Sequence, residues 1–335
     1  MAEKYGIGEH VFEKLPVMVQ DAFSKADSVI NNDKYTKVGC SVSGGADSDV
    51  MMDLITRVDR DKKTKFYFFN TGIEFRATLE HLEKLEEKYG VPIVRINPIK
   101  SIPTCCNDFG TPVISKFVSE QIGRLQSYGF DWREAPMDEL LEQYPQATSS
   151  IKWWCNGYQD GRHTQFNIGY NKWLKLFIMS HPPKFRVSAK CCHYTKKLVA
   201  RQLVRTENLD LMCTGIRRCE GGVRRLSYAN CLSLNKKTQI DNYRPLFWIG
   251  DADKAAYCEA FDVTHSRCYT EYGFRRTGCA GCPFARGIDE KLESVATAEP
   301  QMVRAAHKIF GAAYDYTRKY RDFQAICGTR GVRRS

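Results

Sequence analysis

The sequence Ser-Gly-Gly-Ala-Asp-Ser joins a strand-like apolar run to a helix-like run, and it constrains the chain more than any other feature. Gly44 and Gly45 lack the Cβ that would hold a ligand away from backbone N–H groups, and the loop opens onto the positive end of a helix dipole. The loop therefore predicts a phosphate site, with Ser43 and Ser48 as hydroxyl donors. Asp47 is out of place in a simple anion site, so it indicates either Mg²⁺ beside the phosphates or a carboxylate that orients the loop. The ligand indicated is a nucleotide.

Strand-like and helix-like runs alternate on both sides of this loop. The expected strands are residues 37–41, 65–69, 92–96 and 209–214, and the expected helices are residues 49–59, 77–89, 196–205 and 297–323. This alternation predicts a parallel sheet with right-handed crossovers and ligands beyond the carboxyl ends of the strands. The fold class expected is therefore α/β, a Rossmann-like parallel sheet with helices on both faces.

The same pattern divides the chain into five segments. They are a helical lead-in (1–35), the first part of a nucleotide-binding α/β core (36–100), an aromatic-rich insertion or helical subdomain (101–185), the second part of the core with two cysteine pairs (186–290), and a C-terminal helix with a basic tail (291–335). Trp153 and Trp154 in the third segment are interpreted either as core residues or as rings that stack on a base. The tail beyond the last helix is expected to be loose.

Charge and cysteine content narrow the class of protein. The 335 residues carry a net charge of +11, which suits anionic partners such as nucleotides or nucleic acid. No apolar run approaches the roughly 20 residues that cross a bilayer, and the N-terminus lacks the apolar segment of a signal peptide, so we expect a cytoplasmic protein without membrane contact. Fourteen cysteines in such a chain favour free thiols, metal ligands or a cluster over disulfides. The oligomeric state is not indicated.

Two close cysteine pairs predict a metal centre. Cys191 and Cys192 are adjacent, and Cys279 and Cys282 form a Cys-x-x-Cys pair. Adjacent cysteines are poor disulfide partners because the peptide between them strains the ring, whereas converging thiolates suit zinc or a [4Fe-4S] cluster. The basic run His-Tyr-Thr-Lys-Lys that follows the first pair is expected to be a helix whose positive end favours thiolates.

Other cysteines and several arginines remain open alternatives. Cys105, Cys106 and Cys155 are further candidate ligands or catalysts, or small core residues, and Cys219 and Cys231 are candidates for positions near the nucleotide. The basic pairs are Arg217-Arg218, Arg224-Arg225 and Arg275-Arg276. They are interpreted as contacts to a sulfonucleotide or a nucleic acid backbone, or as solvated surface residues.

Two further turns make the resemblance to a family specific. The second expected strand ends in Asn70-Thr71-Gly72, and the strand over 209–214 ends in Thr214-Gly215-Ile-Arg217. With the Ser-Gly-Gly-x-Asp-Ser loop, these turns resemble the phosphoadenylyl-sulfate (PAPS) reductase family of adenine-nucleotide α-hydrolases, which have the HUP/PP-loop fold. The resemblance covers roughly residues 37–100 and 187–286.

The resemblance implies roles for these residues. Asn70, Thr71 and Gly72 would flank an adenine nucleotide together with Thr214 and Gly215, the nucleotide being ATP, adenylyl sulfate (APS) or PAPS. Arg217 would reach its phosphate or sulfate. The Cys-Cys and Cys-x-x-Cys pattern is similar to the [4Fe-4S] site of APS reductases, which favours that cluster over zinc and implies a C-terminal cluster-binding segment.

The chain also departs from the family in two places. Many reductases of this family have a degenerate phosphate loop and a C-terminal Glu-Cys-Gly-x-His, whereas this loop is intact and Cys327 has neither Glu nor His beside it. We therefore expect ATP- and Mg²⁺-dependent sulfur transfer that releases pyrophosphate, with Asp47 and Arg217 as catalytic residues, a thiol or sulfur donor protein as partner and nucleic acid as one candidate acceptor. The alternatives are a thiol-dependent APS/PAPS reductase in which Cys327 is the nucleophile, and a non-catalytic sensor or nucleic-acid-binding subunit that binds nucleotide and cluster.

Overall fold

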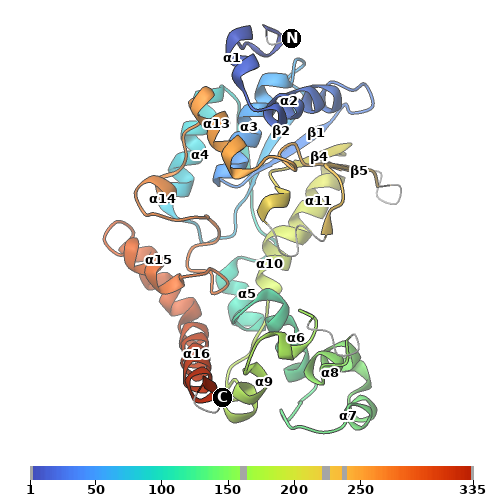
Figure 1. Ribbon diagram of the computed structural model, residues 1–335, viewed down its shortest axis with the longest axis vertical. Coiled ribbons are helices and arrows are strands. Elements are labelled where there is room, and N and C mark those ends of the chain that lie inside the picture. The colour runs from blue at the N-terminus through green and yellow to red at the C-terminus, as the bar shows by residue number, and fades with distance from the viewer. Residues whose placement is uncertain (1–2, 159–163, 221–226, 236–239, 333–335) are drawn as a thin grey trace. The chain divides into compact units, whose positions relative to one another are not determined.

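The computed structural model describes residues 3–158, 164–220, 227–235 and 240–332 (Figure 1). The chain forms two compact units, each built from two stretches of sequence. Unit 1 comprises Met1–Ile99 and Thr195–Cys279, and unit 2 comprises Lys100–Tyr194 and Ala280–Ser335. Arg224 and Arg225, one of the basic pairs of the sequence, lie outside the described residues.

Unit 1 is built on a six-stranded sheet in the order β3-β2-β1-β4-β6-β5. The strands are β1 (Val38–Val42), β2 (Thr64–Phe69), β3 (Ile93–Ile96), β4 (Leu211–Thr214), β5 (Leu232–Ser233) and β6 (Asp241–Tyr243). Every pairing is parallel except that of β5 with β6. Cys40 on the central strand lies in register with Phe66 of β2 and Cys213 of β4, and all three side chains are buried. The predicted α/β fold with a mostly parallel sheet is confirmed.

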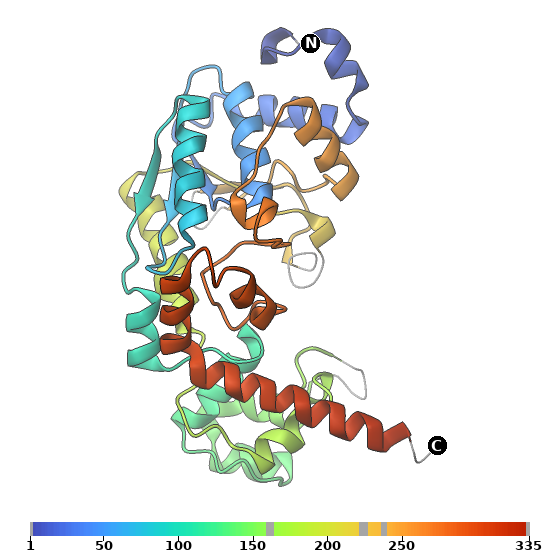
Figure 2. The same cartoon turned by 90° about the vertical axis from the view of Figure 1, so that its left-hand side faces the viewer.

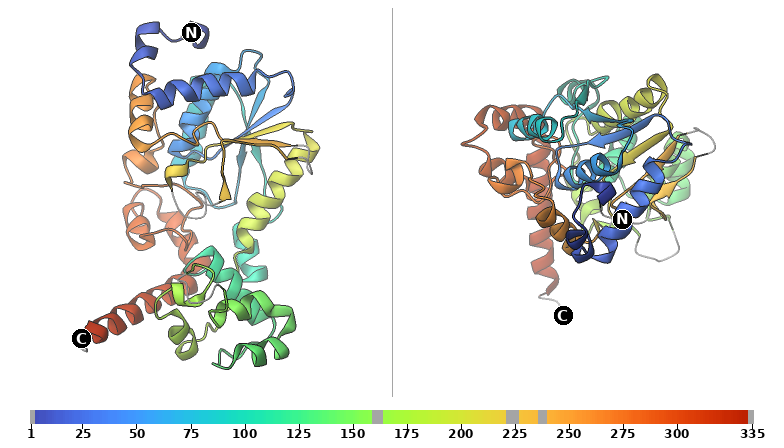
Figure 3. Two further views of the ribbon diagram at one scale, coloured as in Figure 1. Left: turned by 45° about the vertical axis from the view of Figure 1, so that its right-hand side comes forward. Right: turned by 90° about the horizontal axis from the view of Figure 1, so that it is seen from above.

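Helices cover both faces of this sheet (Figure 3). The helices of unit 1 are α1 (Glu9–Lys14), α2 (Val17–Ile30), α3 (Ala46–Val58), α4 (Arg76–Tyr89), α11 (Leu198–Thr206), α13 (Asp251–Ala260) and α14 (Arg267–Thr270), with 3₁₀ turns η1 (Glu3–Tyr5) and η5 (Arg218–Glu220). On one face, Phe23 of α2 and Met51 of α3 belong to the main core with Leu82 of α4. On the other face, Leu203 of α11 packs with Tyr67 and Met212.

The strand order creates a switch point beside β1. The chain leaves β1 through α3 to β2 on one side, and it later returns to place β4 on the other side of β1. The connections that follow β1 and β4 therefore diverge, which opens a crevice at the carboxyl ends of these two strands. Both the Ser-Gly-Gly-x-Asp-Ser loop and the Thr-Gly-x-Arg turn begin at this crevice.

The predicted elements overlap observed ones, and the ends of three helices differ from the prediction by two residues or more. The helix expected over 49–59 begins at Ala46, because the N–H groups of Ser48 and Asp49 already bond to the Gly45 carbonyl at 2.8 and 3.1 Å. The helix expected over 196–205 begins at Leu198 and is preceded by the π-helical turn η4 (His193–Lys197). The C-terminal helix extends through Val332, so the described part of the tail is helical and the expectation of a loose tail is wrong for it.

Unit 2 is helical. Its elements are α5 (Ile102–Phe109), α6 (Lys116–Ser127), α7 (Met137–Gln143), η2 (Pro145–Ala147), α8 (Thr148–Trp154), η3 (Ile168–Tyr170), α9 (Leu174–Ser180), α10 (Lys190–Cys192), α15 (Ile288–Ser294) and α16 (Pro300–Val332), the red helix that runs to the C-terminus in Figure 2. Trp153 and Trp154 are fully buried in its core with Phe177 and Tyr316. Neither tryptophan is therefore available to stack on a base. Of the helices in the described part of the chain, including α16, none is apolar over enough length for a membrane span.

Candidate nucleotide site and cysteine cluster

A cavity of about 520 Å³ lies at the crevice in unit 1. It is large enough for a nucleotide-sized ligand. The phosphate loop lines it with Ser43, Gly45, Asp47 and Ser48, and the second turn adds Thr214, Gly215 and Arg217. Side chains that the motifs do not contain complete the wall: Glu74, Lys196, Cys219, Glu220, Asp251, Lys254, Tyr269, Arg275, Arg276 and Thr277.

The phosphate loop is closed by one hydroxyl. Ser48 Oγ accepts from the N–H groups of Ser43 and Gly45 at 3.2 and 3.1 Å, and it donates its own proton to the Gly45 carbonyl at 2.7 Å. The Ser48 proton is thus used within the loop. Ser43 is exposed, and its hydroxyl donates to Ser48 Oγ at 3.2 Å. Gly44 has φ +65°, and a Cβ there would lie 2.8 Å from Thr78 Cγ2, so this position requires glycine.

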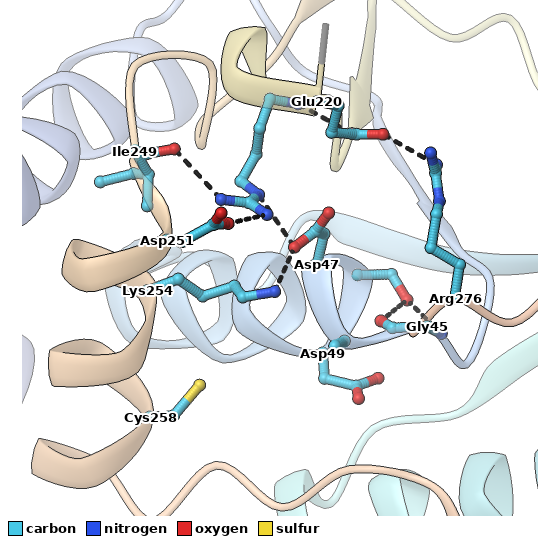
Figure 4. Close-up of polar contacts among 12 residues, drawn as sticks. Gly45, Asp47, Asp49, Glu220, Ile249, Asp251, Lys254, Cys258 and Arg276 are labelled. Carbon is cyan, nitrogen blue, oxygen red and sulfur yellow. Dashed lines mark hydrogen bonds and ion pairs between the residues drawn. The ribbon is translucent and has the colours of Figure 1, made fainter. Parts of the chain in front are cut away.

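Asp47 is the centre of an ion-pair network that faces the cavity (Figure 4). Its Oδ1 lies 2.9 Å from Arg217 Nε and accepts a hydrogen bond from Lys254 Nζ at 2.9 Å. Arg217 also donates to Asp251 Oδ1 at 2.8 Å and to the Ile249 carbonyl at 3.4 Å. A guanidinium has more N–H donors than these contacts use, so Arg217 and Lys254 are held in place and can still bind an anion.

A second group of contacts forms another part of the cavity wall. Arg276 forms an ion pair with Glu220 at 2.8 Å, and Glu220 also accepts from the backbone N–H of Arg217 at 3.2 Å (Figure 4). Tyr269 OH accepts from the N–H of Ala46 at 3.1 Å, at the start of α3. Arg275 is exposed and has no ion pair within the described residues. Its charge is therefore available to a ligand.

The Asn70-Thr71-Gly72 turn lies next to the cavity residues but does not itself line the cavity. The residues beside it, Phe69 and Glu74, line the cavity, and the three turn residues do not. Thr71 is buried and donates its hydroxyl to Glu74 Oε1 at 2.6 Å, while Asn70 Oδ1 accepts from the N–H of Gly72 at 2.8 Å. Burial raises the pKa of Glu74 although Thr71 and Lys196 act in the opposite direction. The turn thus positions Glu74, a cavity residue that sequence reasoning did not single out.

The expected Mg²⁺ is compatible with this cavity only as a partner of the nucleotide. Within the described residues, no three His, Cys, Asp or Glu side chains are grouped to hold a metal ion. Asp47 Oδ2 makes no contact within those residues, so one carboxylate oxygen remains for a cation. Since Mg²⁺ is usually bound through one or two carboxylates and substrate phosphates, the donor set fits an ion that arrives with the phosphates.

A buried network that the sequence did not suggest lies on the same helix. Asp49 is fully buried, and its Oδ2 lies 2.9 Å from His265 Nδ1 and 3.1 Å from His81 Nε2. Cys258 Sγ lies 3.6 Å from the other ring nitrogen of His265. Burial lowers the pKa of His265, but the hydrogen bond to Asp49 and smaller contributions from Cys258 outweigh it and raise that pKa to about 9. An imidazolium at His265 therefore neutralises a carboxylate that would otherwise be buried without a counter-charge.

This network predicts a pH-dependent stability. Because the pKa of His265 rises from its ordinary 6.5 to about 9 on folding, the stabilisation is complete below pH 6.5 and is lost as the pH rises to 9. We expect the unfolding midpoint to fall across this range, and His265→Gln to remove that part of the decline. His10→Gln changes an exposed histidine and is the control. If the urea midpoint falls by the same amount in wild type and in His265→Gln between pH 6.5 and 9, the assignment to His265 is contradicted.

The thiols of unit 2 form a separate group. Cys191 is buried in α10 and Cys192 is half-buried beside it. A hydrogen bond from the Cys192 thiol, burial, and the thiols of Cys106 and Cys282 all raise the pKa of Cys191. Burial, with Cys105 and Cys192, raises the pKa of Cys106 to about 12. Burial and the neighbouring thiols therefore both favour the protonated form of Cys191 and Cys106.

The chemistry of these thiols suits a thiolate-ligated metal centre, although within the described residues they are not grouped closely enough to hold a metal ion. Thiolates that are costly without a cation become favourable when a metal binds, because the metal deprotonates them. Cys191, Cys192 and Cys282 belong to unit 2, and Cys279 ends the sequence of unit 1. Cys106, one of the alternative candidates, is brought beside the predicted ligands, which spacing alone did not indicate.

The remaining cysteines have other surroundings. Cys155 and Cys231 are partly buried against the cores of unit 2 and unit 1. Cys219 is exposed at the nucleotide cavity and donates to the Ile249 carbonyl at 3.4 Å. Cys327 lies on α16 of unit 2 with a half-buried side chain. Arg218 is absent from the lining of the nucleotide cavity and lies 5.0 Å from the Trp248 ring.

One segment of the chain matches a known protein family. Residues 37–129 match the phosphoadenosine phosphosulfate reductase domain. The resemblance predicted from the sequence is confirmed over residues 37–100, which contain the phosphate loop and the Asn-Thr-Gly turn, and the match continues through residue 129 into the expected insertion. No curated protein matches the chain.

Several solved structures are similar to the chain at low sequence identity. A phosphoadenylyl-sulfate (PAPS) reductase from Candida auris is 12% identical, with 81% of this chain and 93% of that chain covered and a TM-score of 0.43. The U34-tRNA thiolase NcsA from Methanococcus maripaludis, solved with its [4Fe-4S] cluster, is 14% identical, with 91% and 79% covered and a TM-score of 0.38. An NH3-dependent NAD synthetase from Campylobacter jejuni is 13% identical, with 92% and 93% covered and a TM-score of 0.38.

Proposed function

We propose that this chain binds ATP with Mg²⁺ in the unit 1 cavity, cleaves it between the α and β phosphates, and thereby activates an acceptor for sulfur transfer. The observation that supports ATP is the intact phosphate loop, closed by Ser48 at the start of α3 and faced by two cations held on Asp47. Loop N–H groups and fixed cations are the means by which proteins stabilise transferring phosphoryl groups.

The reaction proceeds in two balanced steps. In the first, an oxygen of the acceptor attacks the α-phosphorus, the bond to the bridging oxygen breaks, and pyrophosphate leaves with the bond's electron pair. Arg217 and Lys254 stabilise the negative charge that gathers during this step, while the loop holds the phosphates. In the second, sulfide delivered by a sulfur donor protein attacks the activated carbon, a carbon–sulfur bond replaces the carbon–oxygen bond, and AMP leaves with the oxygen.

The two cysteine pairs are the proposed ligands of a metal cluster. Cys191, Cys192, Cys279 and Cys282 would hold the [4Fe-4S] cluster, which when bound supplies iron for binding sulfur. Cys106 is close enough to raise the pKa of Cys191, so it belongs to the same group of thiols. Cys191 and Cys106 are buried, whereas Cys192, Cys279 and Cys282 are partly exposed.

Sulfonucleotide reduction is the second candidate, and the match to the phosphoadenosine phosphosulfate reductase domain favours it. In that reaction the Cys327 thiolate attacks the sulfur of APS or PAPS, the S–O bond breaks, and the nucleotide leaves as its phosphate. An external dithiol then attacks the enzyme thiosulfonate and releases sulfite while the dithiol becomes a disulfide. Cys327 has no Glu or His neighbour in sequence to assist this step.

Product analysis distinguishes the two functions. Incubation with ATP, Mg²⁺, a sulfur donor and candidate acceptors is expected to release pyrophosphate, and APS or PAPS with dithiol is expected to release no sulfite. Cys327→Ser should leave pyrophosphate release within about twofold, as should the matched variant Cys155→Ser, because neither thiol belongs to the ATP cavity. Sulfite release that depends on Cys327 would favour reduction. Absence of turnover by cluster-loaded protein with any nucleotide would favour the sensor.

A further inference from the structure

A second cavity, of about 680 Å³, lies within unit 2 and is separate from the nucleotide cavity. Three exposed cations line it, namely Arg124 of α6, Arg186 and Lys190 of α10, and the acid in its wall is Glu120. Within the described residues, none of these cations forms an ion pair with a carboxylate. The cavity therefore presents an excess of positive charge, which favours an anionic ligand.

Close packing and hydrogen bonds hold the backbone around this cavity in place. A Cβ at Gly123 of α6 would lie 2.3 Å from the Val187 carbonyl oxygen, so only glycine lets the helix approach this closely. Gln126 donates to the Phe185 carbonyl at 2.9 Å and accepts from the Val187 N–H at 2.8 Å. Thr111 donates its N–H to the Arg186 carbonyl at 2.9 Å. The segment that carries Arg186 is thus fixed on both sides before any ligand binds.

Aromatic rings lie among the cations. Phe109 and Tyr194 stack with ring centroids 5.2 Å apart and planes 6° apart, and Lys190 Nζ lies 4.5 Å from the Phe109 ring centroid. Tyr128, at the end of α6, is 43% exposed. Cations that bind phosphate beside an exposed ring that stacks on a base are the combination by which proteins bind nucleotides of single strands.

The cavity also borders the thiol group. Lys190 and His193 line the cavity immediately before and after Cys191 and Cys192 in the chain. Phe109 ends α5, the helix that carries Cys106. The segments that carry Cys106, Cys191 and Cys192 therefore also form walls of this cavity.

We propose that the unit 2 cavity binds a nucleotide, with its phosphates on Arg186, Lys190 and Arg124 and its base against Tyr128. The claim that the bound nucleotide is the sulfur acceptor rests on the proposed function. The claim that the cavity binds a nucleotide rests only on the residues that line it. The nucleotide belongs either to a single-stranded nucleic acid or to a free mononucleotide, and these two sources share the phosphate and the base.

Binding of labelled oligonucleotides tests the cavity without turnover. The probes are fluorescein-labelled single-stranded DNA and RNA of about 12 nucleotides, a length within the usual range of single-strand sites. Arg186→Glu and Lys190→Glu are each expected to weaken binding about tenfold or more and to reduce its salt dependence. Lys184→Glu makes the same change in charge at an exposed lysine outside the cavity and should have a much smaller effect.

The base contact has its own pair of variants. Tyr128→Leu is expected to weaken binding several-fold and Tyr128→Phe to preserve it, since stacking needs the ring and not the hydroxyl. Competition by AMP as effective as by the oligonucleotide would assign the site to a free mononucleotide and still support the proposal. The proposal would be overturned if Lys184→Glu and Arg186→Glu lost the same oligonucleotide affinity. It would also be overturned if neither Arg186→Glu nor Lys190→Glu lowered that affinity. If the protein binds oligonucleotides but releases no pyrophosphate from ATP, the proposed function is contradicted, while the nucleotide site in unit 2 is still supported.

Discussion

Replacing Arg217 with alanine is expected to lower kcat/KM for pyrophosphate release by roughly 10²–10³-fold, the usual effect of removing a fixed group that stabilises developing charge. Arg217 is 5% exposed, lines the nucleotide cavity and bridges Asp47 and Asp251. Its loss removes a cation from the phosphates and also leaves Asp47 with Lys254 as its remaining partner. The measurement is steady-state pyrophosphate release, with ATP affinity followed by calorimetry.

Two variants separate this role from a general effect on folding. Arg218→Ala removes the next residue, an exposed arginine that lies against Trp248 outside the cavity, and should retain activity within about twofold. Arg217→Lys keeps the charge but loses the bidentate geometry, so an intermediate activity is expected. Equal activity of Arg217→Ala and wild type, with an unchanged unfolding midpoint, would remove Arg217 from the catalytic site.

The core of unit 1 could be predicted because its signals are local. The strand over 37–41 and the helix after it differ from β1 and α3 by only a few residues, since apolar periodicity and the two glycines lie within one short stretch. Once a parallel sheet is expected, both Ser43 and Arg217 must lie at the carboxyl ends of strands. The cavity residues of these two turns therefore followed from sequence.

Residues that complete the site could not be predicted because their partners are distant in sequence. Lys254 is 207 residues from Asp47, and His265 is 216 residues from Asp49. Neither pair has a spacing that distinguishes it from ordinary surface charge. A usable signal was Gly250-Asp251, a helix start that follows β6 and so lies at the same edge of the sheet as the phosphate loop. The positions of Cys106 and Tyr128 likewise depend on how the helices of unit 2 pack.

The largest effect expected in unit 2 is complete loss of the iron–sulfur centre when a ligand is changed. Anaerobically purified protein is expected to contain about four irons per chain, as a cluster held by four thiolates implies, and to be brown. Cys191→Ser, Cys192→Ser, Cys279→Ser and Cys282→Ser should each lose the iron and the visible absorbance and unfold at lower temperature, because metal binding is coupled to folding. Iron content, absorbance and the unfolding midpoint are the measurements.

Two further serine variants test which thiols are ligands. Cys155→Ser is the matched control, since Cys155 is a half-buried thiol of unit 2 that packs against the helical core. Cys106→Ser is expected to keep its iron, because the four predicted cysteines complete the ligand set. If Cys106→Ser lost its iron and Cys279→Ser kept it, the fourth ligand would be Cys106 and not Cys279. The thiol of Cys106 lies near those of Cys191 and Cys192. Stoichiometric zinc in place of iron would contradict the cluster, since zinc is the other metal that four thiolates favour.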